Sequence, residues 1–235
     1  MREPSDGLIE RWLADLPAGF DRDRFAEVYR QAWLETARDA TALREPAYRL
    51  RHGHRVARLG LQLLQAPEVA APSSADAEVV WLGGLLHDVT KSGIGGDPPG
   101  EDHAATGAQW VRRHLSRLWP SRRVDHIAEV VYLHNKRRLP ASLEARAVQD
   151  ADLLDHFGAL EIWLAAYAAA GKTEALEECL DYLTGAKNRR WRQYALGHAY
   201  LEATRRLLEE RLDTADRIIR RLEQEAAANL RLDPL

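Results

Sequence analysis

The feature of this sequence that most directly suggests chemistry is the adjacent pair His87-Asp88, which ends the apolar run WLGGLLHD. Successive residues of a helix differ in direction by about 100°, so both side chains reach one ion only if it lies close to the backbone. The apolar run predicts that the pair is buried, and a buried imidazole and carboxylate need partners because burying free charge is costly. A metal ion is the best partner for both groups, although the same dipeptide also occurs as a plain structural pair.

Three more histidines share the context of His87. Each stands at the expected start or end of a helix and near an aspartate or a basic residue: His52, His103 and His134. Imidazole and carboxylate donors favour Fe, Mn, Co, Ni or Zn over Ca or Mg. Such an ion makes a nucleophile of water and polarises a phosphoryl oxygen, which is the chemistry of metal-dependent hydrolysis.

The elements that must position these residues are expected to be helices throughout, because Ala, Leu, Arg and Glu dominate and strand-like alternation is scarce. Asp76 or a neighbour is expected to start the helix that leads into His87. Two Pro- and Gly-containing segments, 66–74 and 92–102, are expected to be loops, the second one mobile and next to the metal motif. The expected helices cover about 8–16, 23–43, 48–65, 76–88, 103–118, 123–134, 142–170, 173–183 and 188–227, the last one bent near Gly197.

The order of the motifs resembles the HD superfamily of metal-dependent phosphohydrolases, over about residues 48–160. The motifs are RHGHRVARLG, GLLHDVTK, EDHAATGA, VVYLHN and VQDADLLD. The resemblance implies an all-α HD-domain helical bundle with additional N- and C-terminal helices. On this reading residues 1–235 form a single all-helical domain, in which 48–160 are the metal-binding core. Residues 172–235 form a C-terminal helical extension, which would complete the bundle or provide the face of a homodimer.

In the family pattern the first histidine stands three residues before an Arg-Val pair. Here that histidine is His52, before Arg55-Val56. His54 is the competing choice, but it lies about 200° further round the helix and does not share the face of His52.

The remaining family positions imply a site for one ion or for two. His87, Asp88 and Asp152 complete the single-metal version with His52. Branches that hold two metals add two histidines, which His103 and His134 match, and Asp88 would then bridge the ions. The alternatives are a capping role for Asp152, with Asp150 and Asp155 as competing carboxylates, and no metal at His103 and His134.

Cations beside the metal site would offset the charge of a phosphate group. Lys91, three residues after Asp88, matches a frequent lysine of the family, and Arg55 is the second candidate for a phosphate clamp. The alternative for Lys91 is a solvated loop residue. Arg122-Arg123 and 136–138 are expected to be solvated, with a phosphate-attracting rim as the alternative.

Composition limits the location and the partners of the chain. Its 235 residues carry a formal net charge of −3, so no global field attracts nucleic acid polymers or acidic membranes. The single cysteine, Cys179, excludes an intramolecular disulfide. No stretch approaches the roughly 20 apolar residues of a membrane span, and the opening residues MREPSDGLIERW contain no apolar core of the length typical of a signal peptide. We therefore expect a soluble cytoplasmic protein.

The resemblance implies a hydrolase acting on a phosphate ester or anhydride, with a nucleotide or a related small metabolite as substrate. Two alternatives stay open. Some HD-fold proteins use a di-iron centre to activate oxygen, and the same donors are compatible with that chemistry. A non-catalytic nucleotide-binding regulatory module is the other alternative, against which the intact set of donors argues.

Overall fold

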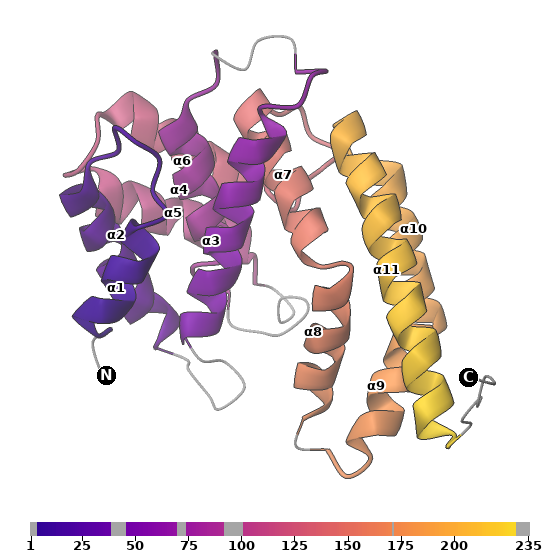
Figure 1. Ribbon diagram of the computed structural model, residues 1–235. Coiled ribbons are helices and arrows are strands. Elements are labelled where there is room, and N and C mark those ends of the chain that lie inside the picture. Colours follow the sequence, from indigo (N-terminus) through magenta and orange to yellow (C-terminus); the bar gives the residue numbers. More distant parts are fainter. Residues whose placement is uncertain (1–3, 39–45, 70–73, 92–100, 171, 229–235) are drawn as a thin grey trace. The chain divides into compact units, whose positions relative to one another are not determined.

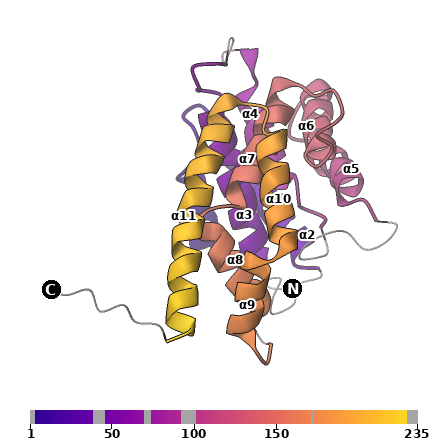
Figure 2. The same cartoon turned by 90° about the vertical axis from the view of Figure 1, so that its right-hand side faces the viewer.

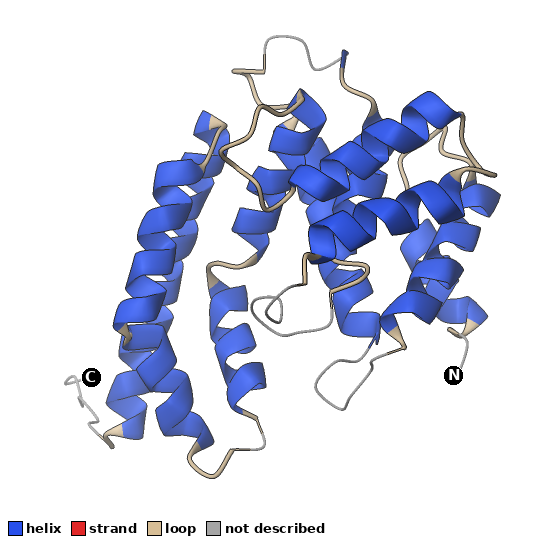
Figure 3. Ribbon diagram, turned by 180° about the vertical axis from the view of Figure 1, so that it is seen from behind, coloured by secondary structure: helices blue, strands red, loops and turns tan. Residues whose placement is uncertain are grey.

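The computed structural model describes residues 4–38, 46–69, 74–91, 101–170 and 172–228. In these ranges it contains eleven helices and no strand, so the expected all-α fold is confirmed (Figures 1 and 3). The helices are α1 (Asp6–Leu13), α2 (Arg22–Thr36), α3 (Pro46–Leu63), α4 (Ala77–Leu86), α5 (His103–Leu115), α6 (Ser121–Leu133), α7 (Leu143–Asp155), α8 (Ala159–Ala169), α9 (Ala175–Thr184), α10 (Ala186–His198) and α11 (Glu202–Ala226). Within the described ranges, none of these helices combines the length and the apolar character that crossing a bilayer requires.

The chain divides into two compact units, residues 1–152 and 153–235, and the boundary falls in the last turn of α7. The single-domain organisation expected from the sequence, with its core over 48–160 and its extension over 172–235, stays a prediction. The expected loop over 92–102 lies largely outside the described residues.

Helix α4 lies inside the first unit, in contact with α3 and α6. It is apolar on all sides, and a helix of that kind is stable only when it is surrounded by other elements. Asp76 caps its N-terminus by accepting hydrogen bonds from the backbone N–H groups of Glu78 and Val79, at 3.0 and 3.3 Å. The predicted start of this helix is therefore confirmed, and its end delivers His87 and Asp88 into the interior.

Two glycines allow α3 and α4 to approach until their backbones touch. A Cβ atom on Gly53 would lie 2.3 Å from the carbonyl oxygen of Leu85, and a Cβ atom on Gly84 would lie 2.7 Å from the Cα of Ala57. No side chain fits in such gaps, so glycine is required at both positions. This approach brings His52, next to Gly53, within reach of the residue that follows α4.

Helices α5 and α6 pack against each other, with the start of α5 beside the end of α6. Asp102 caps α5 by accepting hydrogen bonds from the N–H groups of Ala104 and Ala105, both at 3.1 Å. His103 is the first residue of α5, and His134 directly follows the last residue of α6. The pair of helices therefore presents two histidines at one end.

The second unit contains α8 to α11, with α10 and α11 side by side in Figure 2. A small apolar core is formed by Ala165, Ala169, Cys179, Leu183 and Ile219. A buried carboxylate, Glu161 on α8, accepts hydrogen bonds from Asn188 at 2.7 Å and from Arg192 at 2.9 Å. Arg192 also pairs with Asp216 at 2.5 Å, so this ionic network ties α8, α10 and α11 together.

Two segments that were each predicted to form one helix form two helices in the structure. The segment expected over 142–170 is broken between α7 and α8, where Gly158 has a φ of 85° that a helix does not allow. The segment expected over 188–227 is broken between α10 and α11, because the chain becomes extended at Ala199 and Leu201. The predicted bend near Gly197 is therefore a complete break a few residues later.

Candidate metal centre

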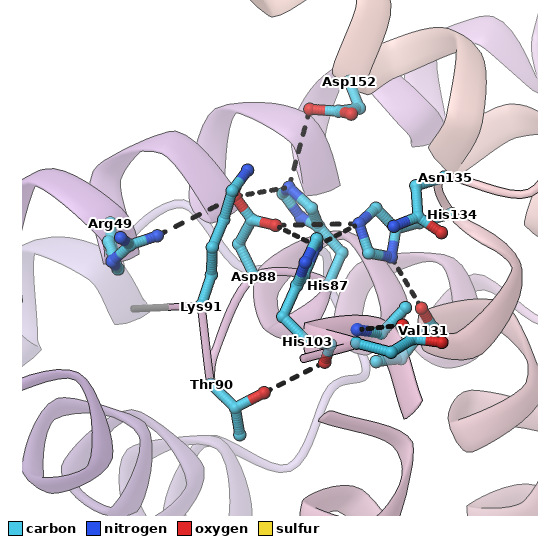
Figure 4. Close-up of polar contacts among 12 residues, drawn as sticks. Arg49, His87, Asp88, Thr90, Lys91, His103, Val131, His134, Asn135 and Asp152 are labelled. Carbon is cyan, nitrogen blue, oxygen red and sulfur yellow. Dashed lines mark hydrogen bonds and ion pairs between the residues drawn. The ribbon is translucent and has the colours of Figure 1, made fainter. Parts of the chain in front are cut away.

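The residues predicted as metal ligands meet in one cluster within the first unit (Figure 4). They come from α3, the turn after α4, the start of α5, the turn after α6, and α7. The cluster consists of His52, His87, Asp88, His103, His134 and Asp152. Segments far apart in the chain thus converge on one point.

One half of the cluster joins His52, His87 and Asp152. Nε2 of His52 lies 3.1 Å from Nε2 of His87. Oδ1 of Asp152 lies 3.3 Å from the former nitrogen and 3.5 Å from the latter. Oδ2 of Asp88 lies 3.8 Å from Nε2 of His87. Donor atoms at these separations can all reach one ion, because metal–donor distances are about 2.0–2.2 Å.

The other half joins Asp88 to His103 and His134. Oδ1 of Asp88 lies 3.1 Å from Nε2 of His103 and 3.6 Å from Nε2 of His134. The two imidazole nitrogens are 3.0 Å apart. Asp88 therefore faces both halves of the cluster with one carboxylate oxygen each, which is the arrangement expected of a residue that bridges two ions.

The helices themselves set the tautomers of two of the histidines. Nδ1 of His87 lies 2.7 Å from the carbonyl oxygen of Gly84, and Nδ1 of His134 lies 2.6 Å from that of Val131. A carbonyl oxygen only accepts, so each Nδ1 carries the proton and donates it. Each Nε2 is left with a lone pair that points into the cluster, as a metal ligand requires.

The electrostatics of the cluster also suit a cation. Burial alone would raise the pKa of Asp88, but Lys91 and His87 overcome this effect and hold the pKa well below its ordinary value. Burial and the nearby His87 lower the pKa of His134 to about 3, so this ring is neutral at neutral pH. Oδ1 of Asp88 is buried and accepts no well-oriented hydrogen bond from the described residues. A charged carboxylate oxygen beside the imidazole nitrogens of His103 and His134 fits a divalent transition metal ion.

Two cations lie on the Oδ2 side of Asp88. Nζ of Lys91 is 2.8 Å from this oxygen and an Nη atom of Arg49 is 3.9 Å from it (Figure 4). Lys91 thus contacts the cluster and is not a solvated loop residue. Arg49 was not predicted, although its place three residues before His52 puts both on one side of α3.

His54 lies on a different side of α3 from His52. The ring of His54 contacts the hydroxyl of Tyr29 at 2.8 Å through Nδ1 and the carboxylate of Asp15 at 3.0 Å through Nε2. Both ring nitrogens are therefore engaged away from His52, as the helical facing predicts. Arg55 and His54 together line a hollow of about 280 Å³ between α1 and α3.

Arg137 was predicted to be solvated, and that prediction is wrong. Its guanidinium is buried and lies 3.1 Å from the carboxylate of Asp150. Asp150, a predicted competitor of Asp152, thus has a cationic partner outside the cluster. Burial of a charged arginine requires such a partner, and a single sequence does not show which residue supplies it.

Comparisons with known proteins agree with this arrangement. A model of the HD domain matches residues 49–156. A predicted HD superfamily hydrolase from an uncultured Thermotogales bacterium is similar in structure, with 21% identity, a TM-score of 0.52, and coverage of 83% of this chain and 91% of that chain. Bacillus subtilis YpgQ in complex with ADP gives 20% identity, a TM-score of 0.53, and coverage of 84% and 97%.

A third structure, an HD-superfamily hydrolase from Bacillus thuringiensis, gives 18% identity, a TM-score of 0.51, and coverage of 86% and 98%. At these identities the likeness shows the fold. No curated protein matches the chain. The HD-domain match extends from just before His52 to just beyond Asp152, over the same helices that bring the cluster together, so residues 49–156 of this chain form an HD domain.

Proposed function

We propose that this HD-domain protein is a metal-dependent phosphohydrolase that cleaves a phosphate ester or anhydride of a nucleotide or related small metabolite. The observation that carries the proposal is the position of Asp88, whose two oxygens face separate groups of imidazole nitrogens. A carboxylate in this position suits one or two divalent ions drawn from Fe, Mn, Co, Ni and Zn.

Each half of the cluster would hold one ion. The ligands of the first would be His52, His87, Asp88 and Asp152, and those of the second would be Asp88, His103 and His134. Bound there, the metal would polarise a phosphoryl oxygen and lower the pKa of water. The chain's own contribution is to hold the ring of His134 neutral through burial, and to orient His87 and His134 through the carbonyl groups that fix their Nδ1 protons.

Lys91 and Arg49 would bind and orient the substrate phosphate. Both lie beside Asp88 at the edge of the cluster, with 18% and 10% of their side chains exposed. Burial alone would lower the pKa of Lys91, but Asp88 more than offsets this effect and raises it, so Lys91 stays a cation. The predicted role of Arg55 in binding phosphate is less well supported, because Arg55 lines the hollow beside His54.

The nucleotide part of the proposal is supported by the ADP complex of YpgQ, which has a similar fold. Two similar structures are also described as HD-superfamily hydrolases. The cytoplasmic location and the homodimer expected from the sequence stay predictions.

The test is elemental analysis of the full chain purified without chelator, together with phosphate release from a panel of nucleotides and phosphate monoesters. We expect one or two transition metal ions per chain and release from part of the panel. Asp88→Asn should lose both metal and activity. Asp125→Asn is the matched control, because Asp125 is an exposed carboxylate on α6 that pairs with Arg112.

Other outcomes would favour the alternatives. An air-sensitive iron centre without phosphate release would favour the di-iron oxygenase. Nucleotide binding without metal and without turnover would favour the regulatory module. A metal-free wild type whose activity is unchanged by Asp88→Asn would reject the proposed metal centre.

A further inference from the structure

The turn that follows α6 is tied to α7 by hydrogen bonds among buried groups. The amide nitrogen of Gln149 donates to the carbonyl oxygen of Leu133 at 2.6 Å. The guanidinium of Arg137 donates to the Asp150 carboxylate at 3.1 Å and, through its other terminal nitrogen, to the carbonyl oxygen of Gln149. Gln149 and Asp150 are fully buried, and Arg137 is 8% exposed. We call these three residues the α6–α7 latch.

The latch holds the chain next to one ligand in each half of the cluster. Leu133 directly precedes His134, which belongs to the half with His103. Asp150 stands two residues before Asp152, which belongs to the half with His52. Because residues two apart on a helix differ by about 200° in direction, Asp150 can face the latch while Asp152 faces the cluster.

The groups of the latch are suited to holding the end of α6 at a fixed distance from α7. The carbonyl groups at the end of a helix have no partner within it, and Gln149 supplies one at the end of α6. The guanidinium of Arg137 is planar and rigid, so its two hydrogen bonds set both distance and orientation, which a lysine ammonium cannot do.

We propose that Arg137 and Gln149 are positioning residues that set the place of His134 relative to Asp152, and so the affinity of the protein for a second metal ion. This inference rests on the proposed metal centre. His52 and Asp152 lie on α3 and α7, and His87 directly follows α4, whose backbone touches α3, whereas His134 depends on the turn after α6. Loss of the latch therefore weakens the half of the cluster that contains His103 and His134.

The experiment is titration of Co²⁺ into the chelator-treated full chain, followed by calorimetry and by the visible absorption of bound Co²⁺. We expect two binding steps in the wild type. In Arg137→Met the Co²⁺ affinity of the first step should be unchanged, and that of the second step should fall by about 10–100-fold. A loss of this size is typical when a residue that supports a metal ligand is removed. The affinity of Arg137→Lys for the second Co²⁺ ion should lie between those of the wild type and Arg137→Met. Lysine keeps the positive charge, but it cannot form the two hydrogen bonds of the guanidinium in their fixed geometry.

Arg123→Met is the matched control. Arg123 pairs with Asp76 at 2.8 Å and with Glu78 at 2.5 Å, and so it clamps the opposite end of α6 to α4. This variant should lose stability and keep both Co²⁺ steps. If Arg137→Met does not fold, Gln149→Met, which removes only the hydrogen bond to Leu133, carries the test.

Two steps of unchanged affinity in the latch variants would overturn the inference while leaving the proposed metal centre intact. Equal weakening of both steps would also overturn it, because the latch would then serve general stability. A single Co²⁺ step in the wild type would remove the second site and the inference with it. A wild type that binds no Co²⁺ would reject the metal centre itself.

Discussion

The two carboxylate oxygens of Asp88 have different neighbours, which are of two kinds: imidazole rings and cationic side chains. Oδ1 faces the imidazoles of His103 and His134, whereas Oδ2 faces the imidazole of His87 and the cationic groups of Lys91 and Arg49. An imidazole can donate a lone pair to a metal, and a lysine ammonium or an arginine guanidinium cannot. Substitutions of the imidazoles and of the cations should therefore have separable effects on metal content and on substrate binding.

Replacing Lys91 by Gln should leave the metal content unchanged and lower kcat/KM for phosphorylated substrates by about 10–100-fold. The reason is that a hydrogen bond to a charged group contributes about 1.5–3 kcal/mol. Steady-state kinetics and elemental analysis on the same preparation measure the two effects. Arg58→Gln is the control, because Arg58 pairs with Asp15 away from the cluster. Unchanged kcat/KM in Lys91→Gln would contradict the proposed role.

The buried ring of His54 should make the stability of the protein depend on pH. Burial lowers its pKa below the ordinary value of 6.5, against the opposing effect of Asp15, while Arg58 and Arg55 lower it further. The unfolded chain therefore binds a proton that the folded chain does not. Stability contributed by neutral His54 is complete above about pH 6.5 and falls as pH decreases below that value, by up to about 1.4 kcal/mol for each pH unit.

Urea unfolding of chelator-treated protein between about pH 7.5 and about pH 5 tests this expectation. The free energy of unfolding should fall less steeply with decreasing pH in His54→Gln than in the wild type. Chelator removes any contribution from pH-dependent metal binding. Equal slopes in the two proteins would show that His54 does not contribute to the pH dependence.

At the scale of the elements, the contact between α3 and α4 should tolerate no added methyl group. In Gly84→Ala the new Cβ would lie 2.7 Å from backbone atoms of Ala57, so the helices must separate. Overpacking of this kind costs about 1–3 kcal/mol, and the separation should also weaken metal binding through His52 and His87. Thermal unfolding and metal titration measure the two effects.

Gly197→Ala is the matched control for this substitution. Gly197 lies within α10, and a Cβ atom there would meet nothing within 4 Å. Alanine favours the helix over glycine by about 0.8–1 kcal/mol, so this variant should be more stable than the wild type. A Gly84→Ala protein as stable as Gly197→Ala would contradict the tight contact seen in the structure.

The elements also show what could be predicted from the sequence. The apolar run and the Asp76 cap predicted α4, because these signals are local. The breaks after α7 and α10 were missed, because they depend on a glycine conformation and on packing between helices. The cluster itself followed from ordered motifs. Arg49 and the Arg137–Asp150 pair were missed, because their partners lie far away in the sequence.

At the scale of the whole molecule, every proposed ligand lies in the first unit, at or before Asp152. A ligand that binds only the folded state stabilises it, by about 2.7 kcal/mol at a free concentration of 100 times Kd. Removal of metal with a chelator should therefore lower the unfolding temperature of the full chain by about 5–10 °C. Differential scanning calorimetry measures this change.

The matched protein for this measurement is Asp88→Asn, whose unfolding temperature should not respond to chelator. Restoring the metal to the wild type should restore its unfolding temperature. A chelator effect of the same size in both proteins would mean that the chelator acts elsewhere than at Asp88.

The turns that carry His87 and His134 have a consequence for the electric field of the molecule. Both residues cap the C-terminal ends of helices, α4 and α6, where the aligned peptide dipoles leave a partial negative charge. Helix α5 starts at the cluster, and its N-terminus carries a partial positive charge. The Asp102 carboxylate, which accepts hydrogen bonds from the N–H groups of Ala104 and Ala105, offsets that charge. The backbone at the ends of α4 and α6 therefore contributes a negative potential at the cluster, which attracts a cation.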